Sequence, residues 1–477
     1  MCWFAGITSF KKEQLEKMWA LLSPRAIDEA YFHYEENCSF YHAHLQVSDL
    51  DKDTSQPYIY ENILVGLVWE IYNKQYLLEK VWIYDDENFF TECQVIALCY
   101  KKLGETYINF VNGEFSIYIF DREKNIHFLY RDRWGVNNLY YKMDENMLYF
   151  ASEMKCLISE ETKISQKNLI EHFVFQFWIS PSTIFDEVYC LRPGTYLKYS
   201  QDTREILDFS EYEYQESGNI IRIIENAVKR RIPTFQKRIF VSLSGWPDSN
   251  LILFFLKKYY KGEIIAYSFE TSSNTEDIKF AKQNTRFLGV KHLIIDMEEY
   301  IPQNDFFEHE WLVSPPNIGK ILKEKYPEYE DIKVEFGGDG KEELILWNNH
   351  YPYNEILLRY RYFLSLWKIK EYTITQEFLN KEMFDYNLQM IDKITLRNGI
   401  ERRLPFTDYE LLRFFKYKTY RQEAEAFLAL HGISLVSWEY WYNLGLKFQY
   451  YDMKELKSLA QLSLEDMKTR ISRIKKV

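Results

Sequence analysis

Short apolar runs bounded by turn-forming residues dominate the N-terminal part of the chain. Residues 63–69, 115–120 and 126–130 are rich in β-branched and aromatic side chains, and Asp, Asn and Gly bound them. Runs of this kind predict β-strands. Residues 94–103 and 167–178 instead place apolar side chains at helical spacing. We therefore expect an α+β sandwich of antiparallel sheets.

A different pattern begins near residue 220. Strand-like runs alternate with apolar helical stretches, in the order 221–231, 239–243, 251–259, 263–269, 276–287 and 292–296. Alternation of strands with helices predicts a parallel α/β sheet. The polar, acidic residues 201–218 predict a linker, and helical periodicity runs from 352 to 477. The sequence thus predicts two domains, 1–205 and 221–477, the second with a helical C-terminal part.

Composition and charge narrow the classes of partner. Hydrophobic residues make up 47% of the chain and charged residues 27%, as in ordinary soluble globular proteins. The net charge of −12 argues against a nucleic-acid partner, since binding to a phosphate backbone relies on Lys and Arg. The six cysteines form no CxxC pair, which argues against a zinc site. Without a signal-peptide pattern or an apolar window of membrane-span length, we expect a cytoplasmic protein with no membrane partner.

The strongest chemical signal is the run SLSGWPDS at residues 242–249, between a predicted strand and a predicted helix. Backbone N–H groups and small hydroxyls at a helix N-terminus form an anion site, because the helix dipole favours negative charge there. Asp248 offers a carboxylate for Mg²⁺ that neutralises bound phosphates. The same composition also fits a strand–turn–helix junction capped by Asp and Ser, and the loop alone does not decide between the two.

Several short motifs, in their order along the chain, resemble those of one protein family. The run at 242–249 resembles the S-G-G-x-D-S pyrophosphate loop of ATP pyrophosphatases. NGEF (112–115), RDRWGV (131–136) and LRPGTY (191–196) are similar to the glutaminase domain of asparagine synthetases, and FGGDGKEE (336–343) and ERRLPFTD (401–408) to their synthetase domain. The resemblance covers residues 1–410. It implies a glutaminase-like sandwich of the Ntn-hydrolase type followed by an α/β ATP-pyrophosphatase domain.

The resemblance also implies that the glutaminase site is degenerate. Cys2 stands where the family has its nucleophile. The family's Asn-Gly pair is Val68-Trp69 here, and Val68 has no side-chain donor for the oxyanion, a loss that typically costs about a hundredfold to a thousandfold in rate. The family Arg that grips the glutamine carboxylate falls at His44, and the Asp that binds the glutamine amine falls at Glu92. We expect this domain to be a scaffold.

By the same resemblance, the second domain holds ATP and Mg²⁺. The residues expected at the nucleotide are Ser244, Gly245, Asp248 and Ser249 at the pyrophosphate end, and Leu243, Ser268, Gly337 and Gly338 near the adenosine. Asp248 and Glu342 are the expected metal ligands. Asp339 is the expected catalytic carboxylate, and Lys447 is the candidate for the family's catalytic lysine.

One departure in this loop opposes ATP chemistry. The family's second loop glycine is Trp246, followed by Pro247. A residue before proline is restricted to extended conformations with negative φ, so Trp246 does not reproduce a glycine-only geometry. Pro247 also removes one N–H donor.

The resemblance leaves several functions open. The leading expectation is an ATP-dependent cyclase, similar to lasso-peptide cyclases, that adenylates a carboxylate for attack by an amine of the same molecule. Its partners would be a peptide or small amino-carboxylate substrate and a leader-peptide-binding or protease partner. The alternatives are a β-lactam synthetase, an ammonia-dependent asparagine synthetase, and a noncatalytic scaffold or binding partner, which the Trp246-Pro247 pair favours.

Overall fold

The computed structural model describes most of both predicted domains. The described residues are 2–22, 28–47, 53–159, 161–165, 167–168, 171, 175, 179–200, 202–209, 219–270, 275–296, 318–339, 388, 399–414 and 417–435. Glu342, Lys447, most of the predicted helix at 167–178 and most of the predicted helical part from 352 onward lie outside them.

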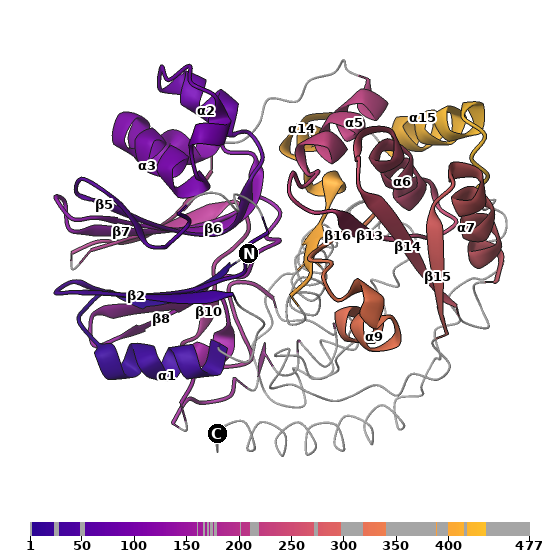
Figure 1. Ribbon diagram of the computed structural model, residues 1–477. Helices are drawn as coiled ribbons and strands as arrows, with labels where there is room; N and C mark the ends of the chain where they lie inside the picture. The colour runs from indigo at the N-terminus through magenta and orange to yellow at the C-terminus, as the bar shows by residue number, and fades with distance from the viewer. Residues whose placement is uncertain are drawn as a thin grey trace.

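The first domain is a sandwich of two six-stranded antiparallel sheets (Figure 1). The first sheet has the order β10 (Tyr189–Cys190), β8 (Tyr140–Asp144), β9 (Met147–Ala151), β1 (Cys2–Ile7), β3 (Cys38–His44) and β2 (Glu29–Glu35). The second has the order β12 (Arg204–Asp208), β11 (Thr195–Tyr199), β7 (Ile126–Arg131), β6 (Gly113–Asp121), β5 (Ile63–Ile71) and β4 (Tyr58–Tyr60). The predicted strands at 63–69, 115–120 and 126–130 are β5, β6 and β7, so the predicted sandwich is confirmed.

Aromatic side chains from both sheets fill the core between them. The ring of Phe40 on β3 stacks on Tyr118 of β6 at 5.3 Å, and Phe150 of β9 meets the same tyrosine at 4.5 Å. Helix α1 (Lys12–Leu22) covers the outer face of the first sheet, and α2 (Lys74–Lys80) and α3 (Glu92–Leu103) cover that of the second. The predicted helix at 94–103 is α3, which begins at the capping box of Thr91 and Gln94.

The second domain is built on a five-stranded parallel sheet, as the sequence predicts. Its order is β15 (Lys291–Asp296), β14 (Glu263–Glu270), β13 (Arg238–Ser242), β16 (Val334–Phe336) and β17 (Glu401–Arg403). The helices are α5 (Ile220–Arg230), α6 (Pro247–Tyr259), α7 (Thr275–Leu288), α9 (Ile318–Lys325), α14 (Tyr409–Phe414) and α15 (Tyr417–Leu430). Helix α6 packs on one face of the sheet through Leu251 and Ile252, and α9 packs on the other through Leu322.

Strand β12 lies in the stretch from residue 201 that the sequence predicts to be a linker. It pairs antiparallel with β11 and carries the first domain's sheet to Asp208. Its side chains are mostly exposed, because an edge strand on the rim of a sheet buries little apolar surface. The polar composition that suggests a linker is therefore that of an exposed edge strand.

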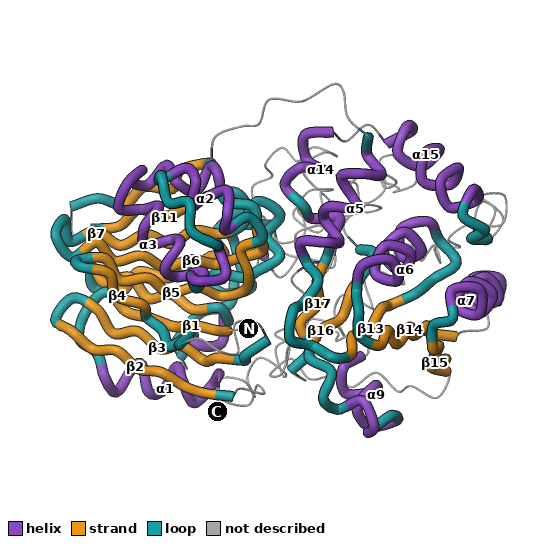
Figure 2. Tube along the Cα trace, turned by 45° about the horizontal axis from the view of Figure 1, so that its top comes forward, coloured by secondary structure: helices purple, strands orange, loops and turns teal. Residues whose placement is uncertain are grey.

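The two domains meet through buried ion pairs at the edge strand β17, which faces the first domain (Figure 2). Arg403 binds Glu70 of β5 at 2.6 Å. Arg231, which follows α5, binds Glu114 of β6 at 3.1 Å and Asp408 at 2.7 Å. Both arginines are at most 2% exposed. Buried charges are stable only when paired, so each domain supplies counterions that the other needs.

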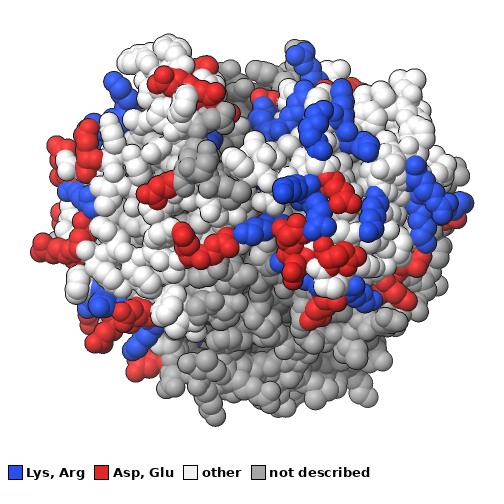
Figure 3. All heavy atoms as spheres, viewed as in Figure 1, with Lys and Arg blue, Asp and Glu red and all other residues white. Residues whose placement is uncertain are grey.

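The outer surface carries charges of both signs. Figure 3 shows acidic and basic side chains interspersed over the first domain, while basic side chains gather over the upper part of the second. Within the described part of the chain, no helix combines the length and the apolar character that crossing a bilayer requires.

Candidate functional site

The predicted glutaminase residues converge at one end of the sandwich. Cys2 begins β1 and pairs in register with His44 at the end of β3. Trp69 on β5, Glu92 at the start of α3 and His44 all line one cavity. Val68 is buried on β5 but does not line that cavity. The side chain of Cys2 lies outside the part that the structure describes.

The cavity is too small for glutamine. Its volume is about 40 Å³, room for one to a few water molecules. Trp69 is a main cause, since its indole is buried and takes up the space that a glycine would leave open. Its backbone keeps a φ of +78°, in the left-handed region that favours glycine and is strained for a bulky residue. The position thus retains a glycine conformation while carrying the largest side chain.

Among its described lining residues, the cavity also has no Lys or Arg to grip the carboxylate of glutamine. Burial lowers the pKa of His44 to about 3, so the imidazole is neutral at physiological pH and does not grip a carboxylate as an arginine does. Its Nε2 lies 3.1 Å from the hydroxyl of Thr54. The carboxylate of Glu92 lies 3.6 Å from the ammonium of Lys74. These contacts support the prediction of a degenerate glutaminase site.

The predicted phosphate loop joins β13 to α6, and its side chains hold it in a compact turn. The N–H of Ser244 donates to Ser249 Oγ at 3.1 Å, and the two serine hydroxyls lie 3.0 Å apart. The Asn250 amide donates to the carbonyls of Ser244 and Trp246. Two hydroxyls and the first turn of α6 therefore face the same place, as an anion site requires.

Trp246 adopts the extended conformation that the sequence predicts, with φ −89° and ψ 156°. It occupies the N-cap position of α6, and its indole accepts no capping hydrogen bond because it is a donor only. The indole N–H instead donates to Asp277 of α7 at 3.4 Å. Pro247 takes the first helical position, where a missing N–H is tolerated. The loop is thus well formed but offers one donor fewer than the family's glycine pair.

A second loop, which follows β16, packs against the first. A Cβ on Gly338 would lie only 3.1 Å from the backbone nitrogen of Ser249, so a side chain here would force the loop or α6 to shift by a few tenths of an ångström. A Cβ on Gly337 would lie 2.6 Å from Nε of Arg402. The two glycines let the loop pass between α6 and that guanidinium. Asp339 follows them and is bound by Arg402.

The remaining predicted residues of the nucleotide site have structural partners. The hydroxyl of Ser268, at the end of β14, donates to the carbonyl of Leu243 at 2.7 Å and lies 2.7 Å from His292 Nε2. It therefore anchors the phosphate loop to the neighbouring strand. Asp248, in the first turn of α6, accepts a hydrogen bond from Tyr420 of α15 at 2.5 Å.

The polar groups of the two loops fit a nucleoside triphosphate better than they fit a metal ion. Small hydroxyls, glycines and a helix N-terminus converge at the carboxyl ends of β13 and β16, where parallel sheets bind ligands. Among the described residues, no group of three or more His, Cys, Asp and Glu side chains is arranged to hold a metal. Of the two metal ligands that the sequence predicts, Asp248 is described by the structure. The other, Glu342, lies outside the described ranges.

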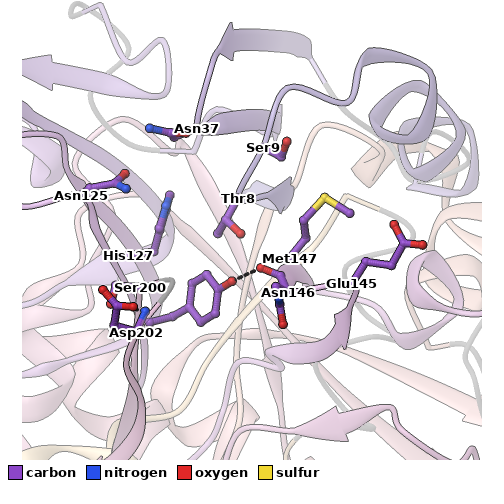
Figure 4. A pocket seen from close by; sticks show the side chains of 11 residues that line it. Thr8, Ser9, Asn37, Asn125, His127, Glu145, Asn146, Met147, Ser200 and Asp202 are labelled. Atoms are coloured by element: carbon purple, nitrogen blue, oxygen red, sulfur yellow. Dashed lines mark hydrogen bonds between the residues drawn. The ribbon is translucent and has the colours of Figure 1, made fainter.

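A polar hollow of about 460 Å³ lies at the opposite end of β1 from Cys2 (Figure 4). Its walls include Thr8, His127 and Asn146, and the Tyr199 hydroxyl donates to the Asn146 carbonyl. None of the predicted site residues lines it.

Comparison with known proteins finds matches for two stretches of the chain. The family description "Glutamine amidotransferase domain" matches residues 1–213, and "Asparagine synthase" matches residues 219–376. These two ranges are thus similar, in order, to a glutamine amidotransferase domain and an asparagine synthase domain. We refer to them below as the glutaminase-like domain and the synthase domain.

Individual relatives are distant. The glutamine-hydrolysing asparagine synthetase 1 of Bacillus subtilis is 25% identical, with 74% of this chain and 59% of that protein covered. The amidase chry2 of Gibberella zeae is 23% identical, with 69% of this chain and 54% of that protein covered. The solved glutamine phosphoribosylpyrophosphate amidotransferase of B. subtilis is 9% identical at a TM-score of 0.34, covering 62% of this chain and 91% of that one. The chain thus spans little more than half the length of its curated relatives.

Sequence reasoning missed Arg402, Tyr420 and the interdomain ion pairs. Arg402 stands in the ERRLPFTD segment (401–408), whose family pattern is E-x-R-x-P-F-x-D. It occupies the first variable position of that pattern, so the resemblance gave no reason to single it out. Tyr420 is one of 39 tyrosines and stands in no motif. The one signal in the sequence was the run of three charged residues Glu401, Arg402 and Arg403.

Proposed function

We propose that this chain is an ATP-dependent ligase that joins a carboxylate to an amine, releasing AMP and pyrophosphate. The observation that carries the proposal is the contact between its two nucleotide loops. Gly338 packs on the backbone of Ser249, which places the Gly-Gly turn against the helix N-terminus and the paired serine hydroxyls. Such a junction suits a chain of phosphates, and Mg²⁺ would supply charge neutralisation there. Both matched domain families support the assignment.

We further propose that the amine does not come from glutamine. The cavity of about 40 Å³, the buried indole of Trp69 and the neutral imidazole of His44 leave no place for that substrate. The amine must then come with the acyl substrate or from solution. A substrate that carries both groups would close on itself through an amide bond.

The finer proposal is a cyclase that acts on a peptide, with a leader-peptide-binding or protease partner to supply it. Its support is the resemblance to lasso-peptide cyclases together with the degenerate glutaminase site. A β-lactam synthetase or an ammonia-dependent asparagine synthetase would use the same loops. A noncatalytic scaffold is favoured by Trp246 and Pro247, since the loop has lost a flexible glycine and one N–H donor.

Calorimetric titration of ATP with Mg²⁺ into the intact chain tests the proposal. Binding that Asp248→Ala weakens at least about tenfold supports it, because that carboxylate stands in the first turn of α6. The matched control is Asp331→Ala, an exposed carboxylate of the same domain whose ion pair with Arg238 lies on the surface. A parent chain that binds no ATP at millimolar concentration would overturn the proposal and favour the scaffold.

The reaction products distinguish the cyclase from the other ATP-dependent ligases. Release of AMP and pyrophosphate with a peptide that contains both a free amine and a side-chain carboxylate supports the cyclase. Asparagine formation from aspartate and ammonium supports the ammonia-dependent synthetase. ADP and phosphate would contradict the whole class.

A further inference from the structure

Arg402 lies on the edge strand β17, and its guanidinium reaches Glu335 on β16 and Ser242 at the end of β13, the two strands that carry the nucleotide loops. The strand β17 places Glu401 and Arg403 toward the glutaminase-like domain and Arg402 toward the opposite side, because successive side chains of a strand alternate. The Arg402 side chain is 7% exposed. A charge this deep is stable only when it is paired with an opposite charge.

Three oxygens surround the guanidinium. Nη1 donates to Glu335 at 2.8 Å, on the neighbouring strand and in register with Arg402. Nη2 donates to Asp339 and, at 3.4 Å, to the hydroxyl of Ser242, the last residue of β13. One side chain thus joins the ends of β13 and β16 to the loop that follows β16.

The remaining nitrogen faces the Gly-Gly turn. Nε of Arg402 is buried and has no hydrogen-bond partner among the described residues. A Cβ on Gly337 would lie 2.6 Å from it and 2.8 Å from the Asp339 carboxylate. The turn therefore lies directly on the guanidinium, and its other glycine lies on the first turn of α6. Arg402 forms one wall of the space that this loop occupies.

Asp339 depends on this contact for its position. Its side chain is 30% exposed, whereas that of Glu335 is fully buried, so Glu335 is fixed by packing and Asp339 is fixed by the arginine. A planar guanidinium holds two carboxylates in a defined geometry, which an ammonium does not, because only the guanidinium has a rigid fork of donors.

We propose that Arg402 is a positioning residue of the nucleotide site, which holds Asp339 and the Gly337–Gly338 turn against the first turn of α6. The proposal rests on the proposed ATP-dependent function. It assigns Arg402 no contact with the substrate: the arginine acts through the loop that it supports. A lysine at this position would keep the charge and lose the fork, so the loop would lose its register with the serine hydroxyls.

Calorimetry of ATP with Mg²⁺ on the intact chain tests the role. Arg402→Lys should weaken ATP binding about tenfold while the chain stays folded. Asp339→Asn should weaken it too, and the double variant should bind no worse than the weaker single variant, since both changes remove one interaction. Arg238→Lys, on the same sheet with its exposed partner Asp331, is the matched control and should bind as the parent does.

A folded Arg402→Lys chain with the parent's affinity would overturn the proposal, and so would fully additive losses in the double variant. If Arg402→Lys does not fold, the pair Glu335→Gln and Arg402→Met removes both buried charges together and should still lose ATP binding. Parent-like binding by that pair would also overturn it. Failure of the proposed function is distinguishable, because then the parent and Asp331→Ala would bind no ATP either.

Discussion

The hydroxyl of Tyr420 donates to Oδ1 of Asp248 over 2.5 Å, and the two residues are 172 positions apart. Tyr420 is fully buried and Asp248 is 5% exposed. The bond ties α15 to the first turn of α6, where the phosphate loop ends. It therefore links the C-terminal described helix to the carboxylate expected to serve the nucleotide.

Removing that hydroxyl should cost stability. Tyr420→Phe leaves Asp248 without this donor in a buried place, and a hydrogen bond to a charged group contributes about 1.5–3 kcal/mol. We expect a loss of that size in the free energy of unfolding, measured by urea denaturation. Tyr84→Phe, whose side chain is 76% exposed, is the control and should change stability by less than about 0.5 kcal/mol. Equal stability of both variants would contradict the assigned bond.

The glutaminase-like domain should release no ammonia from glutamine. The cavity beside Trp69 holds no more than a few water molecules, and His44 is neutral. We expect the parent and Cys2→Ala to be indistinguishable in an ammonia-release assay, with a glutamine-hydrolysing asparagine synthetase as the positive control. Ammonia release that disappears in Cys2→Ala would show a working nucleophile and refute the degenerate site.

Returning a donor to the phosphate loop should strengthen nucleotide binding. Pro247→Ala restores an N–H at the first helical position of α6 without introducing a side chain larger than the ring. One added hydrogen bond to a charged phosphate contributes about 1.5–3 kcal/mol, so we expect a gain of roughly tenfold or more in ATP affinity by calorimetry. Pro327→Ala, at the start of a 3₁₀ turn in the same domain, controls for the loss of proline. A weaker or unchanged affinity would mean that the phosphate does not contact this turn.

The interdomain ion pairs should respond strongly to loss of one partner. Arg403→Met removes the cation between Glu70 and Glu401 and leaves one buried carboxylate and one partly buried carboxylate without it. Such a loss costs about 3–5 kcal/mol in unfolding free energy. The control is Arg122→Met, which breaks a partly exposed pair with Glu35 inside one domain and should cost about 1 kcal/mol or less. Similar losses in the two variants would indicate that the interface pair contributes little.

The elements that could be predicted are those that the local pattern determines. The strand at 239–243 and the helix from 251 are visible because buried strands are apolar throughout and the following turn needs Gly, Pro and Asp. Strand β12 was missed because its side chains are mostly exposed, and its sequence therefore has the polarity of a loop. The extended conformation of Trp246 was predictable, since it depends only on the proline that follows.

The supporting contacts of the site were not predictable. Arg402 meets Asp339 across 63 residues, and Tyr420 meets Asp248 across 172. Contacts between residues so far apart in the sequence depend on how whole helices and strands pack. No local pattern in the sequence predicts them. Sequence reasoning therefore found the loops that are expected to bind the nucleotide but not the side chains that hold those loops in place.

The charge pairs at β17 bear on how such a protein can change over evolutionary time. A domain that has lost its chemistry is ordinarily free to shrink or disappear from the gene. Here deletion of the glutaminase-like domain would strip Arg231 and Arg403 of Glu114 and Glu70 in one event. Each arginine would keep only its partner within the synthase domain, Asp408 or Glu401, and would lose its ion pair across the interface. The interdomain ion pairs therefore give the glutaminase-like domain a structural role that does not depend on glutamine hydrolysis.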